Sequence, residues 1–167
     1  MQVASSFDSI SYSAPGDDLG SGLQPISIAF TTNKIFVLDN NVGGNSYIQR
    51  YTAAGAYDGN YTYMFGNIIK SIAANATTLF SISTGTVYKW SDLNFGGLNA
   101  LTSDVSNPQG MAADANYVYV ADSGNSRIKK FNNSTGALAQ SFGTTGFGDG
   151  KLKTPWDVDY DSNGRCV

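Results

Sequence analysis

The sequence lacks two residue types on which enzymes often depend. Its 167 residues include no histidine, and all 13 acidic residues are aspartate, so glutamate is absent as well. Without an imidazole the chain cannot form a Ser-His or Cys-His dyad or a histidine-ligated zinc site, the commonest arrangements for general-base and metal catalysis. Acid–base chemistry would have to use aspartate, tyrosine or lysine. We therefore expect no catalytic residues and no enzymatic activity.

Charge is also scarce. Charged residues make up 14% of the sequence, against roughly 25% in an average soluble protein. The net charge is −3 and the ten Lys and Arg residues are scattered, so no basic stripe can neutralise phosphates and we expect no nucleic-acid partner. No apolar run reaches the length of about 18 residues that a membrane span needs. The single cysteine, Cys166, cannot form an intrachain disulfide.

Serine, threonine, asparagine and glycine are abundant, and they favour turns and strand ends over helices. Between them lie short β-branched or aromatic runs at residues 35–38, 79–82 and 117–120. Such runs bounded by turn formers are typical of strands, so the sequence predicts an all-β protein. The polar, weakly charged composition also leads us to expect an extracellular or cell-surface location.

The chain contains an internal repeat. Residues 25–39 align without a gap on residues 108–122, residues 69–83 fit the same frame, and residue 155 begins a fourth copy. Successive copies therefore start 44, 39 and 47 residues apart. Repeats of this length, each filled by about four short strands, are typical of β-propeller blades. The third strand of each complete blade is expected to end in an aromatic residue: Tyr51, Trp90 and Phe131.

The third copy resembles an NHL repeat. Residues 107–131 read NPQGMAADANYVYVADSGNSRIKKF, and they are followed by Ser-Phe-Gly at 141–143 and Pro-Trp-Asp-Val-Asp at 155–159. The earlier copies depart from this pattern, because Tyr47 stands where the third copy has Arg127 and the second copy lacks the Asp and the Asn-x-Arg. The resemblance implies a β-propeller of four-stranded antiparallel blades.

Both ends of the chain are predicted to fall inside one blade. Residues 155–167 align on the first two strands of a blade and residues 2–12 on the last two, which gives three complete blades and one blade split between the termini. The predicted segments of this single propeller module are 1–24, 25–68, 69–107, 108–154 and 155–167. A split blade can close within a chain or between chains, and we expect closure between subunits, so that the partner is a second copy in a homo-oligomer or polymer.

One rim of the predicted propeller carries its longer loops. The turns between the second and third strands of each blade emerge there, together with the connections from one blade to the next. Loops on a rigid scaffold are the usual binding elements, so this rim is the expected contact surface for a protein or a glycan. The candidate binding residues are Asp39, Asn45, Asp122, Asn125, Arg127, Phe147 and Asp149. Arg127 has two alternative roles, a pair with Asp122 or a guanidinium presented to a ligand, and the structural pair is favoured.

Two further motifs have a structural and a functional interpretation. Asp157, Asp159 and Asp161 alternate along one predicted strand and so share a face, as in oxygen-rich calcium loops. An EF-hand would need Gly at the sixth position, where this chain has Ser162, so a structural turn is favoured over calcium and no cofactor is expected. Asn-x-Ser/Thr sequons make four asparagines glycosylation candidates, although chance alone explains their number: Asn60, Asn75, Asn132 and Asn133.

These observations predict a non-catalytic extracellular interaction or scaffold propeller that self-associates by completing its split blade between subunits. The alternative comes from the family resemblance, because some NHL-like propellers are metal-dependent lyases. A fragment of such an enzyme remains the second hypothesis, although the absence of histidine and glutamate speaks against it.

Overall fold

The computed structural model describes residues 24–40, 44–64 and 68–161. These residues form strands joined by turns, with a single 3-10 turn, η1 (Ser123–Asn125), as their helical element. None of them lies in a helix long and apolar enough to cross a membrane. The prediction of an all-β protein is confirmed.

Most of the described strands form three antiparallel sheets, each of four strands consecutive in the sequence. Sheet 1 contains β1 (Gln24–Phe30), β2 (Lys34–Asn40), β3 (Ser46–Thr52) and β4 (Tyr57–Met64). Sheet 2 contains β5 (Ser71–Ala74), β6 (Leu79–Ile82), β7 (Val87–Trp90) and β8 (Leu98–Thr102). Sheet 3 contains β9 (Met111–Ala113), β10 (Tyr117–Asp122), β11 (Arg127–Asn132) and β12 (Leu138–Phe142), and it is followed by a parallel pair, β13 (Thr144–Thr145) and β14 (Lys151–Leu152).

The predicted apolar runs occupy the second strands of the sheets. Residues 35–38, 79–82 and 117–120 lie in β2, β6 and β10, where most side chains are buried. The predicted aromatics lie in the third strands β3, β7 and β11, and all three are buried: Tyr51, Trp90 and Phe131. Burial on both faces explains why these strands are apolar with little alternation, whereas the outer strands β8 and β12 are largely exposed.

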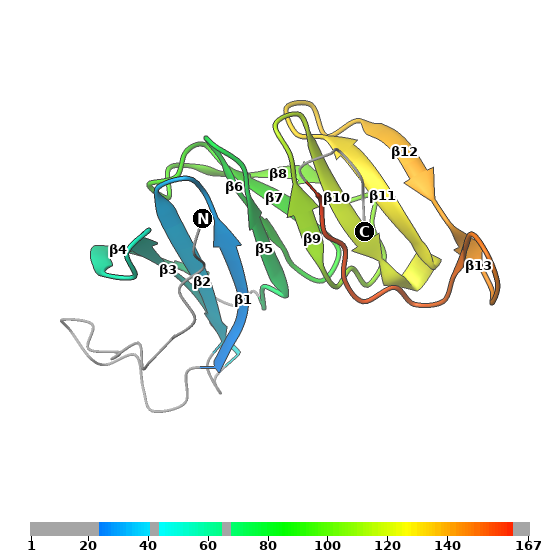
Figure 1. The fold of residues 1–167 in the computed structure, drawn as a ribbon, viewed down its shortest axis with the longest axis horizontal. Helices are drawn as coiled ribbons and strands as arrows, with labels where there is room; N and C mark the ends of the chain where they lie inside the picture. The colour runs from blue at the N-terminus through cyan, green and yellow to red at the C-terminus, as the bar shows by residue number, and fades with distance from the viewer. Residues whose placement is uncertain (1–23, 41–43, 65–67, 162–167) are drawn as a thin grey trace.

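The three sheets stack face to face, with their first strands β1, β5 and β9 side by side (Figure 1). One apolar cluster joins sheet 1 to sheet 2, where Phe36 and Leu38 pack with Ile72 and Trp90. A second cluster joins sheet 2 to sheet 3, where Phe80 and Ile82 pack among residues of β9, β10 and β11. Burial between sheets, rather than within one sheet, holds this arrangement together.

The predicted fourth copy differs from the other three. Residues 155–159 are not strand, and Tyr160 forms only an isolated bridge. Asp157 Oδ1 accepts a hydrogen bond from the Val158 N–H at 2.9 Å, and Asp159 Oδ1 accepts one from the Tyr160 N–H at 2.7 Å. These local bonds use backbone donors that a strand would offer to its neighbour. The strands predicted at residues 2–12 and in 162–167 lie outside the described residues.

Candidate functional site

The first strands of the repeats present one equivalent apolar residue, three positions after each repeat start. In the second, third and fourth copies this residue is buried against the preceding sheet: Ile72 is 2%, Met111 6% and Val158 5% exposed. In the first copy it is Ile28, which is 46% exposed. Sheet 1 has no preceding sheet among the described residues, so its Ile28 face is open.

Two more large apolar side chains extend this open face. Ile26 and Phe30 flank Ile28 at alternate positions of β1, and both are exposed. Alternate residues of a strand point to the same side, so Ile28 and Phe30 share one side of β1, and Ile26 precedes them at a β-bulge. These three exposed apolar residues are here called the β1 edge face. Contiguous exposed apolar residues of this kind mark interaction surfaces.

The third strand of each sheet carries an arginine or a lysine at the same position. In sheets 1 and 2 this cation reaches the next sheet. Arg50, Lys89 and Lys130 are equivalent, because they pair across the sheet with Phe36, Phe80 and Tyr119. Arg50 Nη1 of sheet 1 donates to the Leu93 carbonyl of sheet 2 at 2.7 Å. Lys89 Nζ of sheet 2 donates to the Asn133 carbonyl of sheet 3 at 3.0 Å.

Lys130, the third of these cations, lies at the far end of the stack. Its Nζ lies 4.0 Å from the centre of the Tyr117 ring and 5.2 Å from that of Tyr119. Arg50 and Lys89 each reach the turn after the third strand of the following sheet, and no such turn follows sheet 3 among residues 24–40, 44–64 and 68–161. Lys130 therefore presents the linking cation of the repeat at the end opposite the β1 edge face.

At one end of sheet 3 the η1 turn lies against the connections before and after that sheet. The Gly124 N–H donates to the Ser106 carbonyl at 2.9 Å, and Ser123 Oγ donates to the Pro155 carbonyl. Asp122 ties this turn to the preceding connection, because its Oδ1 accepts the Ser106 N–H at 2.6 Å.

Two of the predicted rim residues are not accessible. Asp39 and Asp122 are fully buried, so the prediction that their carboxylates contact a partner is wrong. Burial raises the pKa of Asp39, and a hydrogen bond from Gln49 partly opposes that shift. Asp122 pairs with Lys129, at 3.4 Å, rather than with Arg127 as expected. Asp122 therefore holds a backbone connection through the Ser106 N–H, whereas Asp39 Oδ2 accepts a hydrogen bond from Gln49 Nε2.

The other predicted rim residues lie at or near the surface. Asn45, Asn125 and Arg127 are half-buried, and Arg127 Nε donates to the Asn125 carbonyl at 3.3 Å. Phe147 and Asp149 are exposed on the loop between β13 and β14. Lys153 Nζ lies 4.7 Å from the centre of the Phe147 ring, so that aromatic side chain is held beside a cation.

The predicted calcium ligands do not converge. Among the described residues, no three acidic, cysteine or histidine side chains are gathered closely enough to hold a metal ion. Asp157 and Asp159 instead accept hydrogen bonds from the residue that follows each of them, as described above.

The sequons fall in four different environments. The Asn133 amide is buried and donates to the Ala115 carbonyl at 3.0 Å, so this residue is not a glycosylation site as the chain is folded. Asn75 Nδ2 donates to the Asp114 carbonyl at 3.1 Å, a contact between sheets 2 and 3 that a glycan would break. Asn132 ends β11, and its Oδ1 accepts the Ser134 N–H. Asn60 lies within β4 rather than in a turn.

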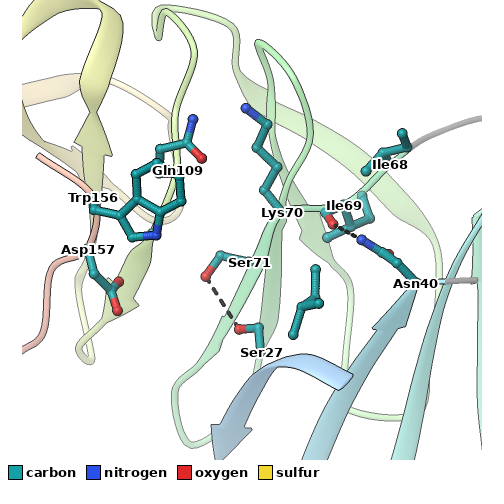
Figure 2. A pocket seen from close by; sticks show the side chains of 11 residues that line it. Ser27, Asn40, Ile68, Ile69, Lys70, Ser71, Gln109, Trp156 and Asp157 are labelled. Atoms are coloured by element: carbon teal, nitrogen blue, oxygen red, sulfur yellow. Dashed lines mark hydrogen bonds between the residues drawn. The ribbon is translucent and has the colours of Figure 1, made fainter. Parts of the chain in front are cut away.

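A cavity that sequence reasoning missed lies where the first strands meet. Its volume is about 270 Å³, and Lys70, Gln109 and Trp156 are among the residues that line it (Figure 2). Each of these three residues stands one position after a repeat start, as Ile26 does. The repeat alignment could therefore have indicated this cavity, because these four positions are equivalent, differ in chemistry and line one space.

Comparison with known families assigns the third copy. Residues 105–131 match the family described as the NHL repeat. This match covers one of the four copies of the internal repeat. The matched residues run from the connection before β9 to Phe131 in β11, so the NHL repeat includes the buried Asp122, the η1 turn and Lys129. The sequence resemblance to this family is confirmed for that segment, and no curated protein shows significant sequence similarity to the chain.

Several solved structures resemble the chain in fold. The computationally designed Ika4 protein is 17% identical with a TM-score of 0.60, over 89% of this chain and 92% of that one. The designed Ika8 protein (17%, TM-score 0.58) and a glutaminyl cyclase from Myxococcus xanthus (9%, TM-score 0.61) match 83% and 84% of this chain. The match spans 41% and 59% of those two chains. Together with the NHL repeat, these likenesses support a β-propeller fold.

Proposed function

We propose that the chain is a non-catalytic, extracellular scaffold module of the β-propeller type that assembles head to tail with copies of itself. In this proposal sheets 1, 2 and 3 are three complete blades. The fourth blade is split, and it is completed by strands from two subunits. The absence of histidine and glutamate supports a non-catalytic role, and the composition supports the extracellular one.

The exposure of Ile28 carries the proposal. The same position is buried in every other copy, so the β1 edge face has the chemistry of a blade interface and lacks only the blade before it. Large apolar side chains gain free energy when they leave water, by roughly 25 cal/mol per Å² of apolar area. A second subunit that places a blade on Ile26, Ile28 and Phe30 would continue the packing already present between the sheets.

The opposite end of the stack offers the complementary half of this contact. Val158 already covers sheet 3 at the place of the next first strand, and Lys130 stands where Arg50 and Lys89 reach into the next sheet. One end therefore presents a linking cation and the other an apolar face. Two different ends that fit each other produce a head-to-tail contact, which gives a closed ring or a filament.

Light scattering on the 167-residue chain tests this proposal, with Ile28→Asp as the test variant. We expect the unchanged chain to exceed the monomer mass of 17.7 kDa increasingly as concentration rises. Ile28→Asp should be monomeric, because a carboxylate on the edge face has to be desolvated on contact. Leu138→Asp is the matched control: Leu138 is 48% exposed on the outer strand β12, where it pairs with Phe131 rather than with Lys130, and its substitution should leave assembly unchanged.

A monodisperse monomer at all concentrations would overturn the proposal and show that the split blade closes within one chain. Electron microscopy of the larger species distinguishes rings from filaments. An equal loss of assembly in Ile28→Asp and Leu138→Asp would contradict the assignment of the contact to the β1 edge face.

A further inference from the structure

The cavity lined by Lys70, Gln109 and Trp156 is here called the axial cavity. It has an aromatic side chain on one side and polar groups that are held by hydrogen bonds. It lies where β1, β5, β9 and the segment after β14 approach one another. Figure 2 shows Trp156 and Gln109 on one side, with Lys70, Ser71 and Ser27 across the space from them. Its volume of about 270 Å³ is slightly below the range of roughly 300–1,000 Å³ typical of sites for drug-sized ligands.

Trp156 is the unusual feature of this cavity. Its side chain is 75% exposed, although it stands in a segment whose neighbour Val158 is buried. The chain has only two tryptophans, and the other, Trp90, is buried. An indole presents a large flat apolar face and a single N–H donor, which suits a ligand with an apolar face and a polar edge.

The polar groups of the cavity are held in place by Asn107. Asn107 Oδ1 accepts hydrogen bonds from Lys70 Nζ at 2.8 Å and from Gln109 Nε2 at 3.0 Å. Gln109 Nε2 also donates to the Asn107 carbonyl at 3.3 Å, and its amide oxygen points towards Lys70 (Figure 2). Asn107 adopts a φ of 43°, a left-handed conformation that asparagine tolerates. The ammonium and the amide are thus oriented before any ligand arrives.

Hydroxyls and charges complete the lining. Ser27 Oγ and Ser71 Oγ lie 3.5 Å apart on the wall opposite Trp156, and each can both donate and accept. The positive charge of Lys70 is balanced by the negative charge of Asp157. Donors and acceptors beside an aromatic face, with no net charge, match a neutral ligand that carries several hydroxyl groups.

We propose that the axial cavity binds one pyranose ring of a neutral carbohydrate. The apolar face of the ring would stack on Trp156, and its hydroxyls would meet Gln109, Lys70 and the two serines. This binding function goes beyond the proposed assembly. The two proposals are tested apart with Ile28→Asp, because Ile28 does not line this cavity, whereas Ile26 belongs both to the edge face and to the cavity lining.

Calorimetric titration of the full chain tests the proposal with D-glucose, D-galactose, D-mannose and N-acetyl-D-glucosamine as probes. We expect saturable binding of at least one of them in the millimolar range, unchanged by added salt because the ligand is uncharged. Trp156→Ala should abolish binding and Trp156→Phe should retain part of it. Gln109→Ala should weaken it about fivefold, the effect of one lost hydrogen bond.

Phe147→Ala is the matched control, because Phe147 is 80% exposed, comparably to Trp156, and lies outside the cavity. It should bind the sugar as the unchanged chain does, and so should the edge variant Ile28→Asp, whether or not assembly occurs. No saturation by any of the four sugars would overturn the proposal. Binding of inorganic phosphate that disappears with added salt would also overturn it, because it would show an anion site at Lys70.

Discussion

Sheets 1 and 3 contain the same buried aspartate in different surroundings. Asp39 and Asp122 stand at equivalent positions at the ends of β2 and β10, and both are fully buried. Lys129 Nζ lies 3.4 Å from Asp122 Oδ2, whereas Asp39 Oδ2 accepts a hydrogen bond from the neutral amide of Gln49 at 3.1 Å. Gln49 pairs with Val37 and Lys129 with Val120, so the glutamine and the lysine are equivalent as well.

The second carboxylate oxygen shows the same contrast. Asp122 Oδ1 accepts the Ser106 N–H, while Asp39 Oδ1 is buried with no hydrogen-bond partner among the described residues. The aspartate is therefore common to both copies, but the groups that compensate its charge are complete only in the copy that matches the NHL repeat. The outer faces of sheets 1 and 3 also differ. Ile28 on the outer face of sheet 1 is exposed, whereas Val158 packs on the outer face of sheet 3.

The largest effect should come from comparing the two isoleucines at equivalent positions. We expect Ile72→Ala to lower the free energy of unfolding by roughly 3 kcal/mol, because Ile72 is buried between sheets and its loss leaves a cavity. Ile28→Ala should cost less than about 1 kcal/mol, because that side chain is half in water. Urea unfolding of dilute, dissociated protein measures both. Equal losses would show that Ile28 is covered within its own chain.

A smaller effect should follow when sheet 3 is given the residue of sheet 1. Lys129→Gln leaves the buried Asp122 with hydrogen bonds but no counter-charge, and we expect a loss of about 2 kcal/mol at neutral pH. Lys151→Gln is the control, because Lys151 is exposed and its substitution should be nearly neutral. An unchanged free energy of unfolding in Lys129→Gln would show that the Ser106 and Asn125 donors suffice for Asp122.

The sequence was sufficient to predict the sheets and their strand aromatics. Burial of Tyr51, Trp90 and Phe131 follows from repeated apolar patterns, and local patterns determine strands. The burial of Asp39 and Asp122 was not predictable in the same way, because a polar residue at a turn is expected to be exposed. Only the packing of the adjoining connection, visible in the Ser106 contact, shows that the turn is covered.

The fourth copy and the cavity show a second limit. Residues 155–161 match the repeat, yet Asp157 and Asp159 each accept a hydrogen bond from the N–H of the next residue. A strand also needs a neighbouring strand to pair with. The cavity is lined by Lys70, Gln109 and Trp156, which come from three copies. The repeat alignment shows that these positions are equivalent but not that they are close in space. Sequence patterns therefore predict the individual strands, whereas the cavity depends on contacts between copies, which those patterns do not show.

The smallest effect should come from giving sheet 1 the lysine of sheet 3. Gln49→Lys places a cation beside Asp39, which should lower the pKa of that carboxyl and raise stability at neutral pH by about 1 kcal/mol. Tyr51 Oη now donates to Gln49 Oε1 at 2.9 Å, so the substitution is best made together with Tyr51→Phe and compared with Tyr51→Phe alone.

The pH dependence of unfolding gives the sharper measurement. Because burial raises the pKa of Asp39 above its ordinary 3.8, the folded chain holds this proton to higher pH than the unfolded chain does. The contribution of Asp39 to stability is therefore greatest below about 3.8 and declines as the pH rises through the folded pKa. Gln49→Lys should reduce or reverse that decline, and adding Asp39→Asn should remove the effect of the lysine. The same pH profile with and without the lysine would mean that Asp39 already has a compensating partner, and the contrast between the two sheets would then lie in their faces alone.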